Sequence, residues 1–164
     1  ATRLRALREL VYRAQVNADT AGDPRLRDLH GGVSFSQTGT PLPTWQTAQP
    51  AAALAVMLGS ERLTPGRLTQ DSPMNEVPGE LSRLVRTLRF MRQLQAGFAE
   101  GFMYDQTRGT TKYVGGVRAS VWDSRMPLTA AALTLTTYAE ALRSVALLRS
   151  RENESEPNEV DPGE

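Results

Sequence analysis

The sequence predicts an all-α domain in which two related helical hairpins are connected by long ordered loops. Three observations lead to this prediction. Four segments carry apolar residues at spacings of three and four, the segments between them are rich in Gly, Pro, Asp and Thr, and the order of features in the first half recurs in the second. With 164 residues, 40% of them apolar, the chain is long enough to form one domain with its own core.

The first half of the chain is expected to form two helices. In residues 2–15 the apolar positions share one helical face, which comprises Leu4, Leu7, Leu10, Val11 and Ala14. Residues 17–43 are polar and contain the breakers Asp23-Pro24 and Gly31-Gly32, which indicates a long ordered loop. The Ala-rich residues 44–58 predict a second helix, which Gly59 is expected to end.

The second half follows the same order. After a loop over residues 60–77, Pro78 suits the first turn of a third helix that ends at Gly97. Its apolar stripe comprises Leu81, Leu84, Val85, Leu88, Met91 and Leu94. Residues 98–126 predict a second long loop, and residues 127–149 a fourth helix. One side of that helix carries Leu135, Tyr138, Leu142 and Val145.

The two halves also align with each other. At an offset of 84 residues, positions 31–58 and 115–142 share eight identities in 28 positions, beginning with Gly-Gly-Val in both. Upstream, residues 5–8 match residues 86–89 at an offset of 81, and Gln15 pairs with Gln95 at 80. The sequence therefore predicts a helical repeat domain over residues 1–150, with repeat-like halves at about 1–60 and 78–149.

Three stretches of the second half carry a family resemblance: residues 88–95 with Gly97-Phe98, residues 115–122 and residues 127–131. The first half repeats them as Gln15, Gly31-Gly32, residues 43–46 and Ala51-Ala52. Over about residues 3–146 this order resembles the repeat of the α/α-toroid proteins, the terpenoid cyclase and protein prenyltransferase superfamily. That family closes a barrel from about twice as many helices, so the resemblance implies a partial toroid-like arc: a fragment, an open arc or half of an assembly.

The resemblance brings no catalytic residue with it. Cyclases of the family protonate their substrate with an Asp-rich motif, and no Asp-x-Asp-Asp run occurs in this sequence. The prenyltransferases hold zinc with Asp, Cys and His, and the sequence has no Cys. Its single His30 cannot build a two-His metal site, and no carboxylate cluster is spaced for a metal. We therefore expect no metal and no cofactor, assign no catalytic residue, and favour a non-enzymatic role.

One ligand pocket is a candidate nonetheless. Acidic and aromatic residues gather in the second long loop: Phe102, Tyr104, Asp105, Trp122 and Asp123. An acid beside aromatic rings can act as a general acid when its pKa is raised. Such an Asp more often caps a turn while the aromatics cover the edge of a core, and an apolar or sugar-like ligand is a further possibility.

The charge is distributed unevenly along the chain. Residues 1–150 hold 18 basic and 12 acidic residues, whereas residues 151–164 hold one Arg and six acids. The segment 151–164 is interpreted as an acidic disordered tail, with a partner-binding arm as the alternative. In the third helix Arg83, Arg86, Arg89 and Arg92 recur every three residues, and the first helix carries Arg3, Arg5, Arg8 and Arg13.

The arginines favour protein over nucleic acid as a partner, because they lack the interleaved aromatic residues that stack on exposed bases. No apolar run is long enough to predict a transmembrane segment, and both a cytoplasmic and an exported protein fit the sequence. The sequence favours a binding or scaffolding subunit that docks on a larger protein assembly. The alternatives are a partial toroid that binds an isoprenoid-like or carbohydrate ligand, and a basic module that binds nucleic acid.

Overall fold

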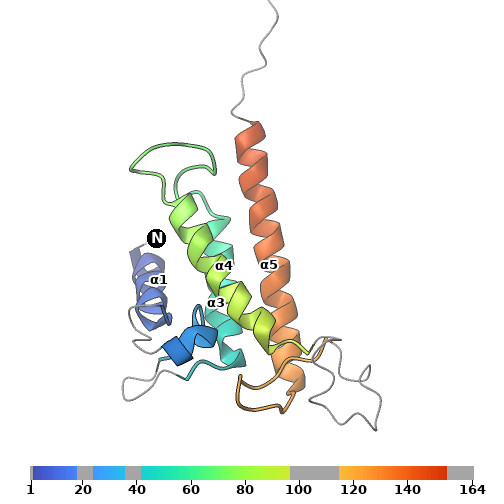
Figure 1. Ribbon diagram of the computed structural model, residues 1–164. Coiled ribbons are helices and arrows are strands. Elements are labelled where there is room, and N and C mark those ends of the chain that lie inside the picture. The colour runs from blue at the N-terminus through green and yellow to red at the C-terminus, as the bar shows by residue number, and fades with distance from the viewer. Residues whose placement is uncertain (1, 18–23, 36–41, 97–114, 155–164) are drawn as a thin grey trace, which may run out of the picture.

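In the computed structural model, the described residues 2–17, 24–35, 42–96 and 115–154 form four α-helices and two short 3₁₀ helices. The α-helices are α1 (Thr2–Ala14), α3 (Ala48–Leu58), α4 (Val77–Leu94) and α5 (Leu128–Asn153). The 3₁₀ helices are η1 (Pro24–Leu29) and η2 (Trp45–Thr47). The predicted all-α class is confirmed (Figure 1).

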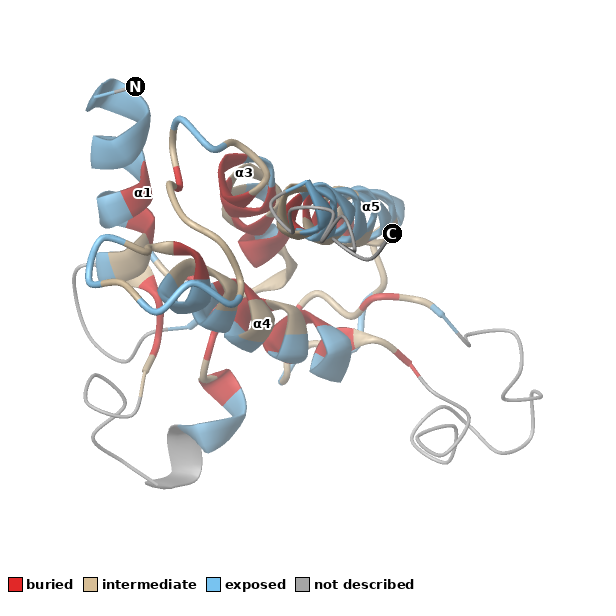
Figure 2. Ribbon diagram, turned by 90° about the horizontal axis from the view of Figure 1, so that it is seen from above, coloured by how far each residue is buried: buried red, intermediate tan, exposed pale blue. Residues whose placement is uncertain are grey.

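Helix α3 lies at the centre of the bundle. It packs against both α4 and α5, and Figure 2 shows α1 and α5 on opposite sides of it. In chain order we group the helices into two helix–loop–helix units, which we call hairpin A (α1 and α3) and hairpin B (α4 and α5). The two hairpins meet where α3 contacts α4 and α5.

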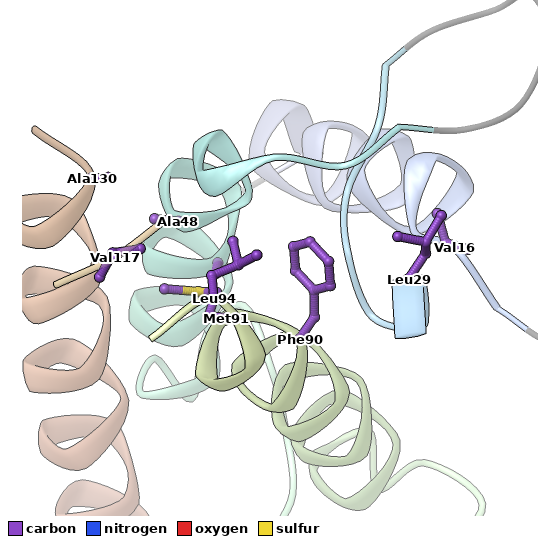
Figure 3. Packing of buried hydrophobic residues seen from close by; sticks show 9 residues of the cluster. Val16, Leu29, Ala48, Phe90, Met91, Leu94, Val117 and Ala130 are labelled. Atoms are coloured by element: carbon purple, nitrogen blue, oxygen red, sulfur yellow. The ribbon is translucent and has the colours of Figure 1, made fainter. Parts of the chain in front are cut away.

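The core consists of two neighbouring clusters between the hairpins. In the first, Phe90, Met91 and Leu94 of α4 are buried against Ala48 and Ala51 of α3 (Figure 3). In the second, Val11, Leu54, Leu58, Leu84 and Leu148 bring all four α-helices together. The small alanines of α3 let α4 and α5 approach closely, and the larger residues of α4 fill the remaining space.

Helix α5 faces the core mainly with small side chains, and Leu135 and Leu142 point away from it. Its buried residues are Ala130, Thr134, Thr137, Ala141, Ser144 and Leu148. Two of these hydroxyls donate to carbonyls of α3: Thr137 Oγ1 to Ala48 O at 2.9 Å, and Ser144 Oγ to Ala55 O at 2.6 Å. Close contact with an Ala-rich helix therefore selects the small face of α5. The stripe predicted from the sequence is half-buried at Tyr138 and Val145 and exposed at Leu135 and Leu142.

Helix α1 departs from its predicted apolar face in a similar way. Leu4, Leu7 and Leu10 are exposed, whereas Arg8 and Val11 are buried. The Arg8 guanidinium reaches the segment that follows α3 and the start of α4, where it lies 3.0 Å from Glu76 Oε2 and 3.7 Å from Glu80 Oε1. A buried charge needs such partners, so Arg8 anchors α1 to the rest of the molecule.

Two predicted helix ends also shift. Helix α4 ends at Leu94 instead of Gly97, because Gln95 has an extended backbone and forms an isolated antiparallel bridge with Val117. Helix α5 continues through Asn153, beyond the predicted boundary at residue 150, and Arg151 and Glu152 contact other parts of the chain. Of the predicted acidic tail, residues 155–164 lie outside the described residues. None of the helices in the described segments is long and apolar enough to cross a membrane.

Candidate interaction surfaces

The loop of each hairpin returns to the end of its first helix in the same way. In hairpin A, Val16 N donates to Gly32 O, Gly31 N to Val16 O, and Ser34 N to Ala14 O, at 2.8–2.9 Å. In hairpin B, Ala96 N donates to Gly116 O, Gly115 N to Ala96 O, and Arg118 N to Leu94 O, each at 2.9 Å. Gly31 and Gly115 both have left-handed backbones, with φ of 89° and 84°. Because the two sets of bonds are equivalent, they align residues of hairpin A with residues of hairpin B. The offset is 80 residues in the first helix and 84 residues in the loop.

Hairpin A contacts hairpin B through polar groups near this loop. Gln15 Nε2 donates to Arg83 O at 3.1 Å and to Thr87 Oγ1 at 2.8 Å. A Cβ built on Gly31 would lie 2.1 Å from Arg86 O, so the loop can approach α4 this closely only with glycine. At the start of the Ala-rich helix, Trp45 N donates to Ala119 O at 3.0 Å.

Two rows of exposed leucines lie on the outermost helices. The α5 leucine row comprises Leu128, Leu135 and Leu142, and the α1 leucine row comprises Leu4, Leu7 and Leu10. Leu135 and Leu142 are 71% and 74% exposed, and the spacing of seven residues keeps the α5 row on one helical face. Sequence reasoning placed several of these leucines in helical stripes without recognising a surface. The alternating Ala, Thr and Ser on the other side of α5 were the signal that a second face could pack instead.

The predicted arginine ridge of α4 is exposed at all four positions, Arg83, Arg86, Arg89 and Arg92. The Arg83 guanidinium lies 4.1 Å from the ring centroid of Tyr12, which is a cation–π contact between the two hairpins. Arg92 donates to Gln95 Oε1 at 2.6 Å. Arg86 and Arg89 line a basic cleft of about 470 Å³ together with Arg27 and His30. The ridge therefore contributes partly to internal contacts and partly to a cationic surface.

Arg8 does not belong to a solvent-exposed ridge, in contrast to its interpretation from the sequence. Its guanidinium donates to Leu63 O at 3.1 Å and lies among Thr64, Glu76 and Glu80. Burial raises the pKa of the Glu80 carboxyl above its ordinary value, and the positive charges of Arg8 and Arg83 oppose this shift. The cluster is a structural connection between α1 and α4.

The candidate ligand pocket is only partly within the described residues. Phe102, Tyr104 and Asp105 lie outside them. Trp122 is 53% exposed, and Asp123 is held by Arg125, whose Nε lies 2.9 Å from Asp123 Oδ2. The hydrogen bonds from Arg125 lower the pKa of Asp123, which is the opposite of what a general acid requires. Asp123 accepts from Arg125 N at 3.0 Å and so stabilises a turn.

Within the described residues, no group of three or more His, Asp or Glu side chains could hold a metal ion. Comparisons with protein-family models, with curated proteins and with solved structures find no match for this chain.

Proposed function

We propose that the chain is a non-enzymatic subunit of a larger protein assembly, bound through the α1 and α5 leucine rows. The observation that carries this proposal is the exposure of regularly spaced leucines on the two outermost helices of the bundle. Soluble monomers rarely expose large contiguous apolar patches, because removing apolar surface from water is favourable. A partner that covers these rows would gain that free energy.

The α5 leucine row has the dimensions of a helix-binding surface. Leu128 and Leu142 are separated by 14 residues, which corresponds to about 21 Å along the helix axis. The row continues through the small exposed residues Ala132 and Ala139, which permit close approach of a second helix. The exposed arginines of α4 would favour partners with acidic side chains.

Kinship with the α/α-toroid repeat is part of the same proposal. What supports the internal repeat on which that kinship rests is the equivalent set of backbone hydrogen bonds at the two loops, together with the eight shared identities in 28 positions. A stack of helical hairpins contacts only its neighbours, so a short arc leaves an apolar surface at each end. An arc of this kind is suited to docking in a larger assembly.

The proposal can be tested by the native mass of the tagged full chain, isolated under mild conditions from its source cells. We expect a stable mass well above 18.0 kDa, with the other components identified by mass spectrometry. The double substitution Leu135→Asp/Leu142→Asp should release the chain from the complex, because a buried charge without a partner is costly.

The control is Val56→Asp, which introduces one such charge at an exposed apolar position of α3 outside both leucine rows. It should leave the complex intact. A wild-type chain that is recovered as a monomer would overturn the proposed function. A complex that is indifferent to the double substitution would overturn the role of the α5 leucine row.

A further inference from the structure

We propose that the open surface of hairpin B binds hairpin A of a second copy of this chain, head to tail, and so repeats the internal contact between the hairpins. This inference rests on the proposed function and names the partner. It follows from comparing equivalent positions of the two hairpins, which the loop hydrogen bonds align at offsets of 80 and 84.

The Ala-rich helices α3 and α5 have one face in common at equivalent positions. This face is covered in α3 and open in α5. In α3, four positions at helical spacing are buried by hairpin B: Ala48, Ala51, Ala55 and Leu58. At an offset of 84 the equivalent positions of α5 are all exposed: Ala132, Leu135, Ala139 and Leu142. Ala51 and Leu58 are 0% and 2% exposed, against 71% and 74% for Leu135 and Leu142. The face that hairpin B covers on α3 is thus left open on α5.

The glycine turns show the same difference. A Cβ on Gly31 would lie 2.1 Å from Arg86 O of hairpin B, whereas no described atom lies within 4 Å of a Cβ built on Gly115. Gly115 nevertheless keeps the same left-handed backbone, with φ of 84°. At an offset of 80, the residue equivalent to Arg86 is Ala6. The carbonyl of Ala6 in a second copy would therefore approach Gly115.

The glutamines that end the first helices agree with this pattern. Gln15 is buried and donates to Arg83 O of hairpin B. Gln95 is half-buried and accepts from Arg92 of its own helix. In a head-to-tail contact, Gln95 Nε2 could donate to Arg3 O of the second copy, because Arg3 is equivalent to Arg83 at an offset of 80.

On α1, a complementary surface is exposed at the other end of the molecule. Hairpin A buries three residues on one face of α4: Leu84, Thr87 and Phe90. Their equivalents in α1 are Leu4, Leu7 and Leu10, the exposed α1 leucine row. Phe35, which is equivalent to Ala119 in the loop, is also exposed. Each copy therefore has an open surface on hairpin B. Its α1 leucine row, in hairpin A, offers the surface that would cover hairpin B of another copy.

A contact of this kind is heterologous, because the two copies use different surfaces. It predicts rings or open chains of copies, in contrast to the closed twofold dimer that would form if the α5 leucine row paired with itself. This distinction can be measured with variants that block one surface each.

The test uses analytical ultracentrifugation of the full chain across a concentration series. The wild type should associate beyond 18.0 kDa. Leu135→Asp/Leu142→Asp blocks the hairpin B surface, and Leu7→Asp/Leu10→Asp blocks the hairpin A surface. Each variant alone should be monomeric, since a copy with either surface blocked has no complementary partner. A mixture of the two should form a one-to-one dimer, because each variant supplies the surface that the other has lost.

Gly115→Ala tests whether the contact has the register of the internal one. A methyl group at this position meets no described atom of its own chain but would collide with the Ala6 carbonyl of the second copy. We expect the association constant to fall by about tenfold or more. Val56→Asp, by contrast, should leave association unchanged. Far-ultraviolet circular dichroism of each variant checks that the fold is kept.

Three outcomes would overturn the inference: a wild type that is monomeric at all concentrations, a mixture of the two blocked variants that stays monomeric, or a hairpin A variant that still dimerises alone. The first result leaves the proposed function standing if the native complex contains other chains with a single copy of this one. A chain that is monomeric both in isolation and in its source cells would overturn both proposals.

Discussion

Gly31 and Gly115 have the same backbone conformation in different surroundings. Both have positive φ, which costs a residue with a side chain about 1–2 kcal/mol. Only at Gly31 would a Cβ also meet a backbone carbonyl, that of Arg86 at 2.1 Å. Backbone atoms cannot move aside as the end of a flexible side chain can. The same substitution at the two positions therefore separates conformational strain from steric collision.

We expect Gly31→Ala to destabilise the chain more than Gly115→Ala, by about 1–3 kcal/mol. The excess arises from the displacement of α4 by the added methyl group. Urea unfolding of both variants at concentrations where the chain is monomeric measures the difference. Equal destabilisation of the two variants would show that hairpin A does not approach α4 as closely as described.

Glu80 contributes a pH-dependent term to stability. Burial raises the pKa of its carboxyl, while Arg8 and Arg83 oppose the shift. Because the folded-state pKa lies above the unfolded-state value, the folded chain binds the proton more tightly. The contribution of Glu80 to the free energy of unfolding is then greatest in acid and falls as the pH rises through the raised pKa.

Comparing the wild type with Glu80→Gln tests this sign. The free energy of unfolding of the wild type, relative to that of the variant, should decrease from about pH 4 to about pH 7. The exposed Glu61→Gln serves as the control and should show a flatter difference. If the relative stability of the wild type instead rose with pH, the prediction would be wrong. The attraction between the Arg8 guanidinium and the Glu80 carboxylate, 3.7 Å apart, would then affect the pKa of Glu80 more than burial does.

At the scale of elements, α5 is amphipathic in an unusual sense. Small residues and hydroxyls form most of the face toward the core, together with Leu148, whereas Leu128, Leu135 and Leu142 face outward. The hydroxyls of Thr137 and Ser144 connect α5 to α3 by hydrogen bonds, because each donates to an α3 carbonyl. A helix of this composition can pack closely against Ala-rich α3 and still offer apolar surface to another partner.

Ser144→Ala should lower the free energy of unfolding by about 1 kcal/mol, through loss of the buried 2.6 Å hydrogen bond to Ala55 O. Ser150→Ala is a matched control in the same helix, where the hydroxyl is exposed and donates to Ala146 O. Both substitutions gain the same helix propensity, so their difference isolates the contact between α3 and α5. Equal effects in chemical denaturation would contradict the importance of this contact.

At the scale of the whole molecule, the two hairpins meet at α3, and the outer helices α1 and α5 carry the exposed leucine rows. The internal contact between hairpins shows what each surface can bind, since equivalent positions are buried at the centre and exposed at the ends. Under the head-to-tail proposal, stability and association use the same kind of contact. Substitutions at the internal contact are then expected to act on folding, and substitutions in the exposed leucine rows on assembly.

The sequence by itself determined the four helices, because their periodicity and their Gly and Pro boundaries are local properties. It also showed the similarity of the halves, and its two Gly-Gly pairs lie where the backbone has positive φ, at Gly31 and Gly115. Periodicity identifies a helical face but not what covers it.

Only the tertiary structure decided that Arg8 is buried, that the small face of α5 packs on α3, and that Leu135 and Leu142 are exposed. The physical reason is that burial depends on the partner helix. The alanines of α3 admit small side chains at close range, and this geometry directs the leucines of α5 to the surface.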